Sequence, residues 1–189
     1  KKIAKKIIST NKIDFLNIIK GHIDTDPALT KVIPLQGMAS APHLDFAGEI
    51  KFNTKFPIFH ASKINDVSTA RHAVESGKLD MVGMTRAHIA DPHIINKIMS
   101  GNEDTIRPCV GATYCLDRIY EGNEALCIHN PATGREKFMP HEISVQAKKK
   151  KKIVIVGAGP SGLEAAKICA ERGHNVVVFE ANQSAGGQL

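Results

Sequence analysis

The sequence predicts an α/β fold built from parallel strand–helix units. Two observations predict it. Short apolar runs alternate with helix-like segments in the first half, and a bare β-branched run later leads directly into a glycine turn and a helix pattern. With 189 residues, the chain has room for one full domain or for parts of two. Its 42% share of hydrophobic residues is typical of a globular protein.

The first hundred residues contain three apolar runs that suit buried strands, at 13–19, 56–61 and 79–84. Asn65 and Asp66 can cap a helix that ends at Gly77. Asp91 and Pro92 are expected to open another helix, with proline just inside its start. Strand–helix repeats of this length predict right-handed parallel βα units.

Charge and hydropathy exclude two classes of partner. Much of the net charge of +6 comes from lysine-rich runs at 1–6 and 148–152, and a basic run between folded segments is usually a solvated linker. Aromatic residues for base stacking make up only 5%, so we expect no nucleic acid. No run of 18 apolar residues and no signal-peptide core occur, so we expect no membrane span and a cytoplasmic location. Both ends look cut, which indicates a fragment.

A nucleotide-binding pattern begins after the second lysine run. The strand-like residues 153–156 lead into Gly157, Gly159 and Gly162 and then into a helix pattern. Gly157 allows a tight turn, Gly159 lets the backbone approach a pyrophosphate, and Gly162 lets helix and strand pack closely. The helix N-terminus adds free N–H groups for the phosphates.

The second strand of this pattern, at 175–179, ends at Glu180, where an acid can bind a ribose hydroxyl. An acid in place of an arginine favours a nucleotide without a 2′-phosphate. The stretch 180–188 is similar to the flavoprotein form of the motif, in which FAD or ADP is the ligand.

Three of the four cysteines lie in a loop-rich segment from Ile106 to about His141. Five residues separate Cys109 from Cys115, and eleven separate Cys115 from Cys127. Cysteines in a chain without a secretory signal argue for metal or redox chemistry, and three clustered thiolates suggest a soft metal. Cys169 lies in the predicted helix after the glycines and is interpreted as a packing residue.

The cysteine segment resembles the cluster segment of the trimethylamine dehydrogenase and 2,4-dienoyl-CoA reductase family. The similar runs are Arg107-Pro108-Cys109-Val110-Gly111, Cys115-Leu116-Asp117 and Cys127-Ile128-His129-Asn130. Family members join an old-yellow-enzyme-like FMN barrel, a 4Fe–4S cluster and an ADP- or FAD-binding domain in that order. The resemblance covers nearly the whole chain. It implies the C-terminal part of a (β/α)8 barrel at 1–105, a cluster segment and linker at 106–147, and the truncated start of a Rossmann-like domain at 148–189.

The resemblance also implies which residues bind cofactors. Barrel enzymes bind phosphate with the loops after strands seven and eight, and Lys63, Thr85 and Arg86 would contact FMN there. Cys109, Cys115 and Cys127 would hold the cluster. Where the family has a fourth cysteine, this chain has Ala112. A cluster with a non-cysteine fourth ligand and a lost cluster both remain open. We expect a bound cluster, because the other three cysteines keep the family's spacing.

The function that the resemblance implies is the oxidative N-demethylation of a small methylated amine, as in the N-methylproline demethylase-like members. Electrons would pass from the substrate to FMN and then outward to an electron-transfer partner. One alternative is an NADH-dependent enoate or dienoyl-CoA reductase, and another is a truncated nucleotide-binding fragment without activity. A loop explains His22, Asp24 and Asp26 as well as catalysis does, so no catalytic residue is assigned. A homo-oligomer is compatible with the sequence.

Overall fold

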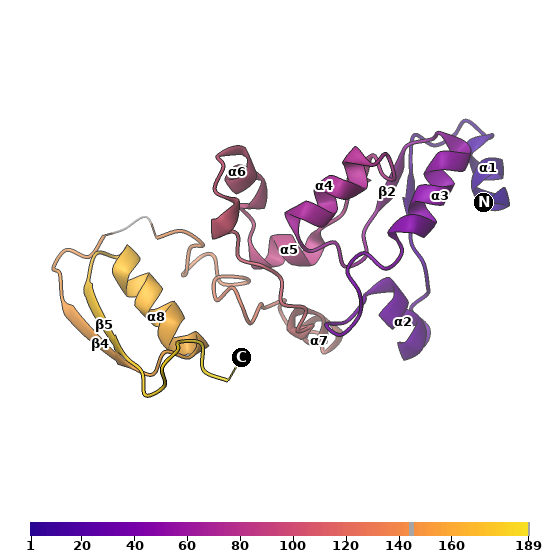
Figure 1. Cartoon of the computed structure of the whole chain (residues 1–189). Helices are drawn as coiled ribbons and strands as arrows, with labels where there is room; N and C mark the ends of the chain where they lie inside the picture. The colour runs from indigo at the N-terminus through magenta and orange to yellow at the C-terminus, as the bar shows by residue number, and fades with distance from the viewer. Residues whose placement is uncertain (144–145, 189) are drawn as a thin grey trace. The chain divides into compact units, whose positions relative to one another are not determined.

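The chain folds as two compact units, Lys1–Arg135 and Glu136–Leu189 (Figure 1). The structure is a computed structural model and describes residues 1–143 and 146–188. The cysteine segment as far as Arg135 packs with the first unit. The boundaries predicted at 105 and 147 stay predictions. Among the described residues, no helix is long and apolar enough to cross a membrane.

The first unit is built on a parallel sheet in the order β1-β2-β3. Its strands are β1 (Leu16–Ile18), β2 (Ile58–His60) and β3 (Met81–Val82). Leu16 pairs with Ile58, and Phe59 pairs with Met81. Helix α3 (Leu44–Thr54) is the second of two helices between β1 and β2, and α4 (Val67–Glu75) lies between β2 and β3. This arrangement confirms the α/β prediction and its parallel strand–helix units.

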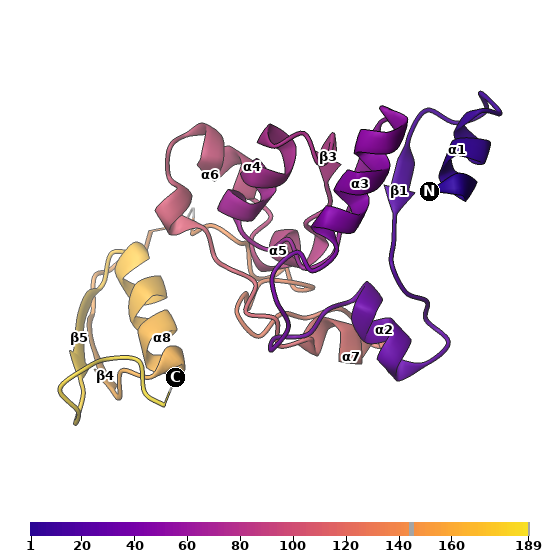
Figure 2. The same ribbon diagram turned by 45° about the vertical axis from the view of Figure 1, so that its right-hand side comes forward.

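Shorter helices complete the first unit. They are α1 (Lys2–Ile8), α2 (Asp26–Val32), α5 (Thr85–Ala90), α6 (Ile94–Met99), the 3₁₀ helix η1 (Glu103–Thr105) and α7 (Tyr114–Tyr120). Figure 2 shows α2 and α7 side by side at the end of the unit that lies beyond the sheet.

The hydrophobic core lies between the sheet and helices α3 and α4. Ile58 of β2, Ala47 of α3 and Ala73 of α4 are fully buried there. Side chains alternate along a strand, so Phe59 projects from the opposite face, where its ring stacks on Phe15 with centroids 4.5 Å apart. The helices therefore cover one face of the described sheet.

The predicted helix after Asn65 is confirmed as α4. Asp66 caps it, because its Oδ1 accepts a hydrogen bond of 2.7 Å from the backbone N–H of Thr69. The helix opening predicted at Asp91-Pro92 is corrected, since α6 begins at Ile94. Asp91 is instead buried, and its carboxylate joins α6 to the segment at Arg107. Its Oδ2 accepts hydrogen bonds from Lys97 Nζ at 2.5 Å and from the Arg107 backbone N–H at 2.9 Å.

The second unit contains β4 (Lys152–Val156), α8 (Pro160–Glu171) and β5 (Asn175–Phe179). The two strands are parallel and pair from Lys152 opposite Asn175 to Val156 opposite Phe179. The predicted order of strand, glycine turn, helix and strand is confirmed.

Candidate functional site

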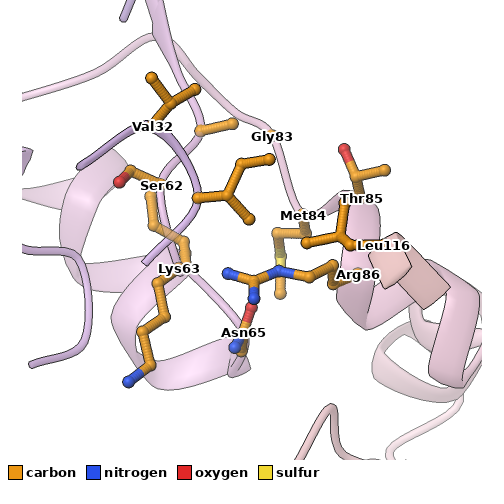
Figure 3. Close-up of a pocket in the computed structure, with 12 residues that line it drawn as sticks. Val32, Ser62, Lys63, Asn65, Gly83, Met84, Thr85, Arg86 and Leu116 are labelled. Carbon is orange, nitrogen blue, oxygen red and sulfur yellow. The ribbon is translucent and has the colours of Figure 1, made fainter. Parts of the chain in front are cut away.

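A cavity of about 230 Å³ lies beyond the carboxyl ends of β2 and β3 (Figure 3). The loop that follows β2 lines it from Ala61 to Asn65, and the residues that follow β3 line it from Gly83 to Arg86. The three residues predicted to contact FMN, Lys63, Thr85 and Arg86, therefore lie around one cavity. The parallel strands bring these loops together because their carboxyl ends meet at one edge of the sheet.

Arg86 reaches into this cavity from the first turn of α5. Figure 3 shows its guanidinium extending from the helix toward the loop after β2. Its Nη2 donates a hydrogen bond of 3.0 Å to the carbonyl oxygen of Pro34. Its Nη1 is buried and has no hydrogen-bond partner among the described residues, and the same holds for the Ser62 hydroxyl. Buried donors without partners are costly, so these two atoms suit an anionic ligand such as a phosphate.

Lys63 lines the same cavity, but its ammonium group is directed elsewhere. The Nζ atom donates hydrogen bonds of 2.7 Å and 2.8 Å to the carbonyl oxygens of Leu35 and Gln36, and it also contacts that of Met38. A lysine ammonium has three donors, so these carbonyls use all of them. Figure 3 shows the ammonium pointing away from the Arg86 guanidinium.

The three clustered cysteines line a second, small cavity of about 30 Å³. Ala112 and Arg86 line it with them, so Arg86 borders both cavities. Burial raises the pKa of the Cys115 thiol, and the neighbouring Cys109 raises it further. The backbone N–H of His129 lies 3.4 Å from the Cys127 sulfur, to which it donates.

The three thiols of this cavity are the donor type that iron–sulfur clusters take in proteins. Among the described residues, no three His, Cys, Asp or Glu side chains are grouped closely enough to hold one ion. Each thiolate of a 4Fe–4S cluster binds a different iron, so its ligands stand further apart than those of one ion. A cavity of about 30 Å³ holds only about one or two water molecules, so a cluster would fit only if the cysteine loop, residues 109–115, moved outward.

A third cavity, of about 160 Å³, lies between α2 and α7. Leucine and isoleucine side chains line it together with the exposed carboxylates of Asp26 and Asp117 and with Tyr120. The sequence offered no signal for this cavity, because α2 and α7 are far apart along the chain. His22 and Asp24 do not line it and instead pair with each other at 3.3 Å.

The glycine turn of the second unit has the geometry that its sequence predicts. Gly157 has a φ of 97°, which favours glycine. A Cβ on Gly162 would overlap the carbonyl oxygen of Gly157, so this glycine allows α8 to pack on the turn. Gly159 is the N-cap of α8, and a Cβ there would meet nothing within 4 Å.

Glu180 stands at the end of β5, beside the glycine turn. Its carboxylate accepts hydrogen bonds from the backbone N–H groups of Asn182 at 2.9 Å and Ala158 at 2.7 Å. These bonds hold the pKa of Glu180 below its usual value. The predicted ribose-binding acid is therefore ionised and adjacent to the predicted phosphate-binding turn.

Comparison with known proteins identifies relatives along the whole chain. The chain is 64% identical over 187 residues to a probable N-methylproline demethylase of Rhizobium meliloti. This match covers 99% of the chain and 27% of the relative. It is 46% identical over 190 residues to the N,N-dimethylglycine/sarcosine dehydrogenase of Chromohalobacter salexigens, covering 100% of this chain and 27% of that protein. The chain belongs to the family of these oxidoreductases. It spans about a quarter of the length of the curated relatives that it matches, at 27%.

Other matches agree with this family. Residues 155–189 match the NAD(P)-binding Rossmann-like domain family. The structure of 2-naphthoyl-CoA reductase in complex with 2-naphthoyl-CoA superimposes with a TM-score of 0.87 at 32% identity, covering 98% of this chain and 28% of that one. Histamine dehydrogenase from Rhizobium sp. 4-9 shares the fold, with a TM-score of 0.85 at 22% identity, covering 98% and 27%. The predicted family resemblance is confirmed.

Proposed function

We propose that the full-length protein containing this chain is an FMN-dependent oxidoreductase that oxidatively demethylates a small methylated amine. Arg86 carries the proposal, because its Nη1 is buried without a described partner at the cavity beyond β2 and β3. The reaction class is supported by the names of relatives that act on N-methylproline and on N,N-dimethylglycine and sarcosine.

In this proposal the first unit is the C-terminal part of a (β/α)8 barrel. Its support is the parallel order β1-β2-β3 with a helix in each connection, and a cavity after the last two strands, where barrel enzymes bind phosphate. Arg86 Nη1, the Ser62 hydroxyl and Thr85 would hold the FMN phosphate. Lys63 would contact FMN through its main chain only, since carbonyls already use its ammonium group. When bound, FMN supplies a two-electron acceptor for the amine.

The cavity between α2 and α7 supports an amine as the substrate. A protonated methylated amine carries one positive charge and several apolar methyl groups, and this cavity combines two carboxylates, Asp26 and Asp117, with an apolar lining. It shares Ile33 and Leu116 with the cavity proposed for FMN. These side chains would exclude water between the amine and the flavin site, while the carboxylates would hold the cation.

Two further cofactors belong to the proposal. Cys109, Cys115 and Cys127 would hold a 4Fe–4S cluster in a widened cysteine cavity. When bound, the cluster supplies a one-electron carrier between the flavin and an electron-transfer partner. Gly157, Gly159, Gly162 and Glu180 would bind FAD or ADP, with the pyrophosphate at the N-terminus of α8.

The alternative function is an NADH-dependent reduction of an enoate or an acyl-CoA. Its support is a structural neighbour named 2-naphthoyl-CoA reductase and a relative at 50% identity from Caballeronia cordobensis named as a multifunctional alkene reductase/demethylase. The third candidate, a nucleotide-binding fragment without activity, would apply to the chain in isolation.

One assay separates these functions. The purified full-length protein is mixed anaerobically with N-methylproline or N,N-dimethylglycine, and the flavin absorbance and the release of formaldehyde are measured. Demethylation predicts flavin bleaching and one formaldehyde for each methyl group removed. Bleaching by NADH together with reoxidation by an enoate, and none by the amines, would favour the reductase.

The flavin site is tested by Arg86→Ala. A charge-assisted contact contributes about 1.5–3 kcal/mol, so the variant should bind FMN roughly 10- to 150-fold more weakly. FMN occupancy after dialysis measures this loss. Arg71→Ala is the matched control, because Arg71 pairs with Glu103 at 2.6 Å on the surface of the same unit and does not line the cavity. Unchanged occupancy in Arg86→Ala would remove Arg86 from the flavin site.

A further inference from the structure

The loop at residues 34–38, between α2 and α3, is held by side chains from two other segments. Lys63 Nζ donates to the carbonyl oxygens of Leu35 and Gln36 at 2.7 Å and 2.8 Å and contacts that of Met38. Arg86 Nη2 donates to the carbonyl oxygen of Pro34 at 3.0 Å. Four carbonyls of one short loop are therefore bound by two cations, and Pro34 itself is fully buried.

The backbone of Lys63 also contacts the connection between α2 and α3. It has a φ of 50°, in the left-handed region, and its carbonyl oxygen accepts a hydrogen bond of 3.1 Å from the Ala41 N–H. The main chain and the side chain of Lys63 thus both form hydrogen bonds with the connection between α2 and α3. The three carbonyls use all three donors of the ammonium group, so none remains for a phosphate.

The 34–38 loop packs directly on the cysteine loop. Gly111, which lies between Cys109 and Cys115, has a φ of 71°. A Cβ at this position would overlap the Gln36 side-chain oxygen and would lie 3.4 Å from the Gln36 Cα. Gly111 is buried although its neighbours Val110 and Ala112 are exposed. Gln36 is therefore the surface against which this turn of the cysteine loop rests.

We propose that Lys63 is a positioning residue that holds the 34–38 loop so that Gln36 supports the cysteine loop at Gly111. Its side chain serves the cysteine site and does not bind the flavin phosphate. The inference rests on the proposed function in one respect, because the cysteine loop is taken there to hold an iron–sulfur cluster. The contacts of Lys63, Gln36 and Gly111 do not depend on any cofactor.

The first test therefore needs no cofactor. Hydrogen–deuterium exchange is measured on the full-length protein for peptides covering residues 34–38 and 109–115, in wild type and in Lys63→Met. Methionine keeps much of the length of the side chain and removes its three donors. Loss of charged hydrogen bonds should speed exchange in both peptides by about tenfold or more.

Lys55→Met is the matched control. Lys55 is also a lysine in the left-handed region, with φ 54°, and it is exposed, with no side-chain hydrogen bond found among the described residues. Its substitution should leave both peptides unchanged. Faster exchange at 34–38 with an unchanged rate at 109–115 in Lys63→Met would overturn the proposed support of the cysteine loop.

The second test uses cofactor-loaded, anaerobically purified protein. In Lys63→Met, iron should be released to the chelator ferrozine about tenfold faster than in wild type, while the dissociation constant for FMN should stay within about twofold. Gln36→Gly should also speed iron release, because it removes the side chain on which Gly111 rests. Weaker FMN binding with unchanged iron release in Lys63→Met would instead make Lys63 a phosphate ligand and overturn the inference. Wild-type protein without iron would contradict the proposed cluster, and the exchange experiment would still decide the role of Lys63.

Discussion

Lys63 and Arg86 line the same cavity, but their hydrogen-bond donors have different partners. The compact ammonium of Lys63 is surrounded by three carbonyls, whereas the planar guanidinium of Arg86 presents its donors in a fork. One arm of the fork, Nη2, is bound to Pro34, and the other, Nη1, is buried without a described partner. The sequence predicted an FMN contact for both residues. Their surroundings leave only Arg86 with a charged donor free for an anion.

Gly159→Val tests the nucleotide site at the scale of one residue. Gly159 has a φ of −74°, and a Cβ there would meet nothing within 4 Å, so a β-carbon is accommodated in the folded turn without backbone strain. The added side chain would occupy the space where phosphates approach the N-terminus of α8. In the full-length protein we expect loss of ADP or FAD binding, measured by calorimetry, with an unchanged melting temperature.

Ala170→Val is the control, because it places the same valine side chain at an exposed position near the far end of α8. It should bind the nucleotide as wild type does. Equal affinity in Gly159→Val and wild type would show that the turn does not receive the pyrophosphate.

The strands of the first unit are shorter than their apolar runs predict. The run at 56–61 contains a strand at Ile58–His60, and the run at 79–84 contains one at Met81–Val82. Asp80 contributes to this, because its Oδ2 accepts the Ile58 backbone N–H at 2.7 Å, a donor that strand pairing would otherwise use. Apolar runs indicate where a strand is buried, but its ends depend on which backbone groups find partners.

Helix α4 carries an N-cap whose contribution can be measured. Replacing a capping aspartate with alanine costs about 1 kcal/mol, so Asp66→Ala should speed amide exchange in the first turn of α4 by roughly fivefold. Asp66→Asn is the matched control, because asparagine keeps the oxygen that accepts from Thr69. Wild-type exchange rates in Asp66→Ala would contradict the role of this cap.

The same cap predicts a dependence on pH. Partial burial raises the pKa of Asp66, but hydrogen bonds from Ser68 and Thr69 outweigh it and hold the pKa below its usual value. The stabilisation is therefore fully present above the usual aspartate pKa of about 4, and it is lost as the pH falls through the lowered pKa. Asp66→Asn should not show this loss, since its side chain does not titrate.

Across the whole molecule, Ala112 stands where the family resemblance predicts a fourth cysteine. Ala112 lines the cavity of the three cysteines, so Ala112→Cys would add a fourth thiol to it. We expect anaerobically purified full-length protein to contain iron and sulfide between the amounts of a 3Fe and a 4Fe cluster. Air should drive it toward the 3Fe form. Ala112→Cys should raise both the iron content and the stability in air.

Ala170→Cys is the control for this substitution, because it adds an exposed thiol on α8, outside the cysteine cavity. It should leave the iron content unchanged. Iron near zero under strict anaerobiosis, in wild type and in Ala112→Cys alike, would mean that the cysteines are packing residues. Electrons would then have to leave FMN by another route.

Much of the architecture could be predicted because its signals are local. The second unit could be predicted from its apolar strand patterns and its glycines. Gly157 takes a positive φ and Gly162 allows close packing, and both effects act within a few residues. The cap of α4 lies within three residues of its acceptor. The spacing of Cys109, Cys115 and Cys127 also predicted that they share one site, and they line one cavity.

The sequence by itself determined the α/β class, the nucleotide turn, the cysteine set and the family. Only the tertiary structure decided that Lys63 binds carbonyls 27 and 28 positions away, that Arg86 binds one 52 positions away, and that Gln36 meets Gly111. It also created the cavity between α2 and α7. The physical reason is that a side chain's partners are set by which loops the parallel sheet brings to one edge. Residue type and spacing along the chain do not indicate which of these loops will lie next to one another.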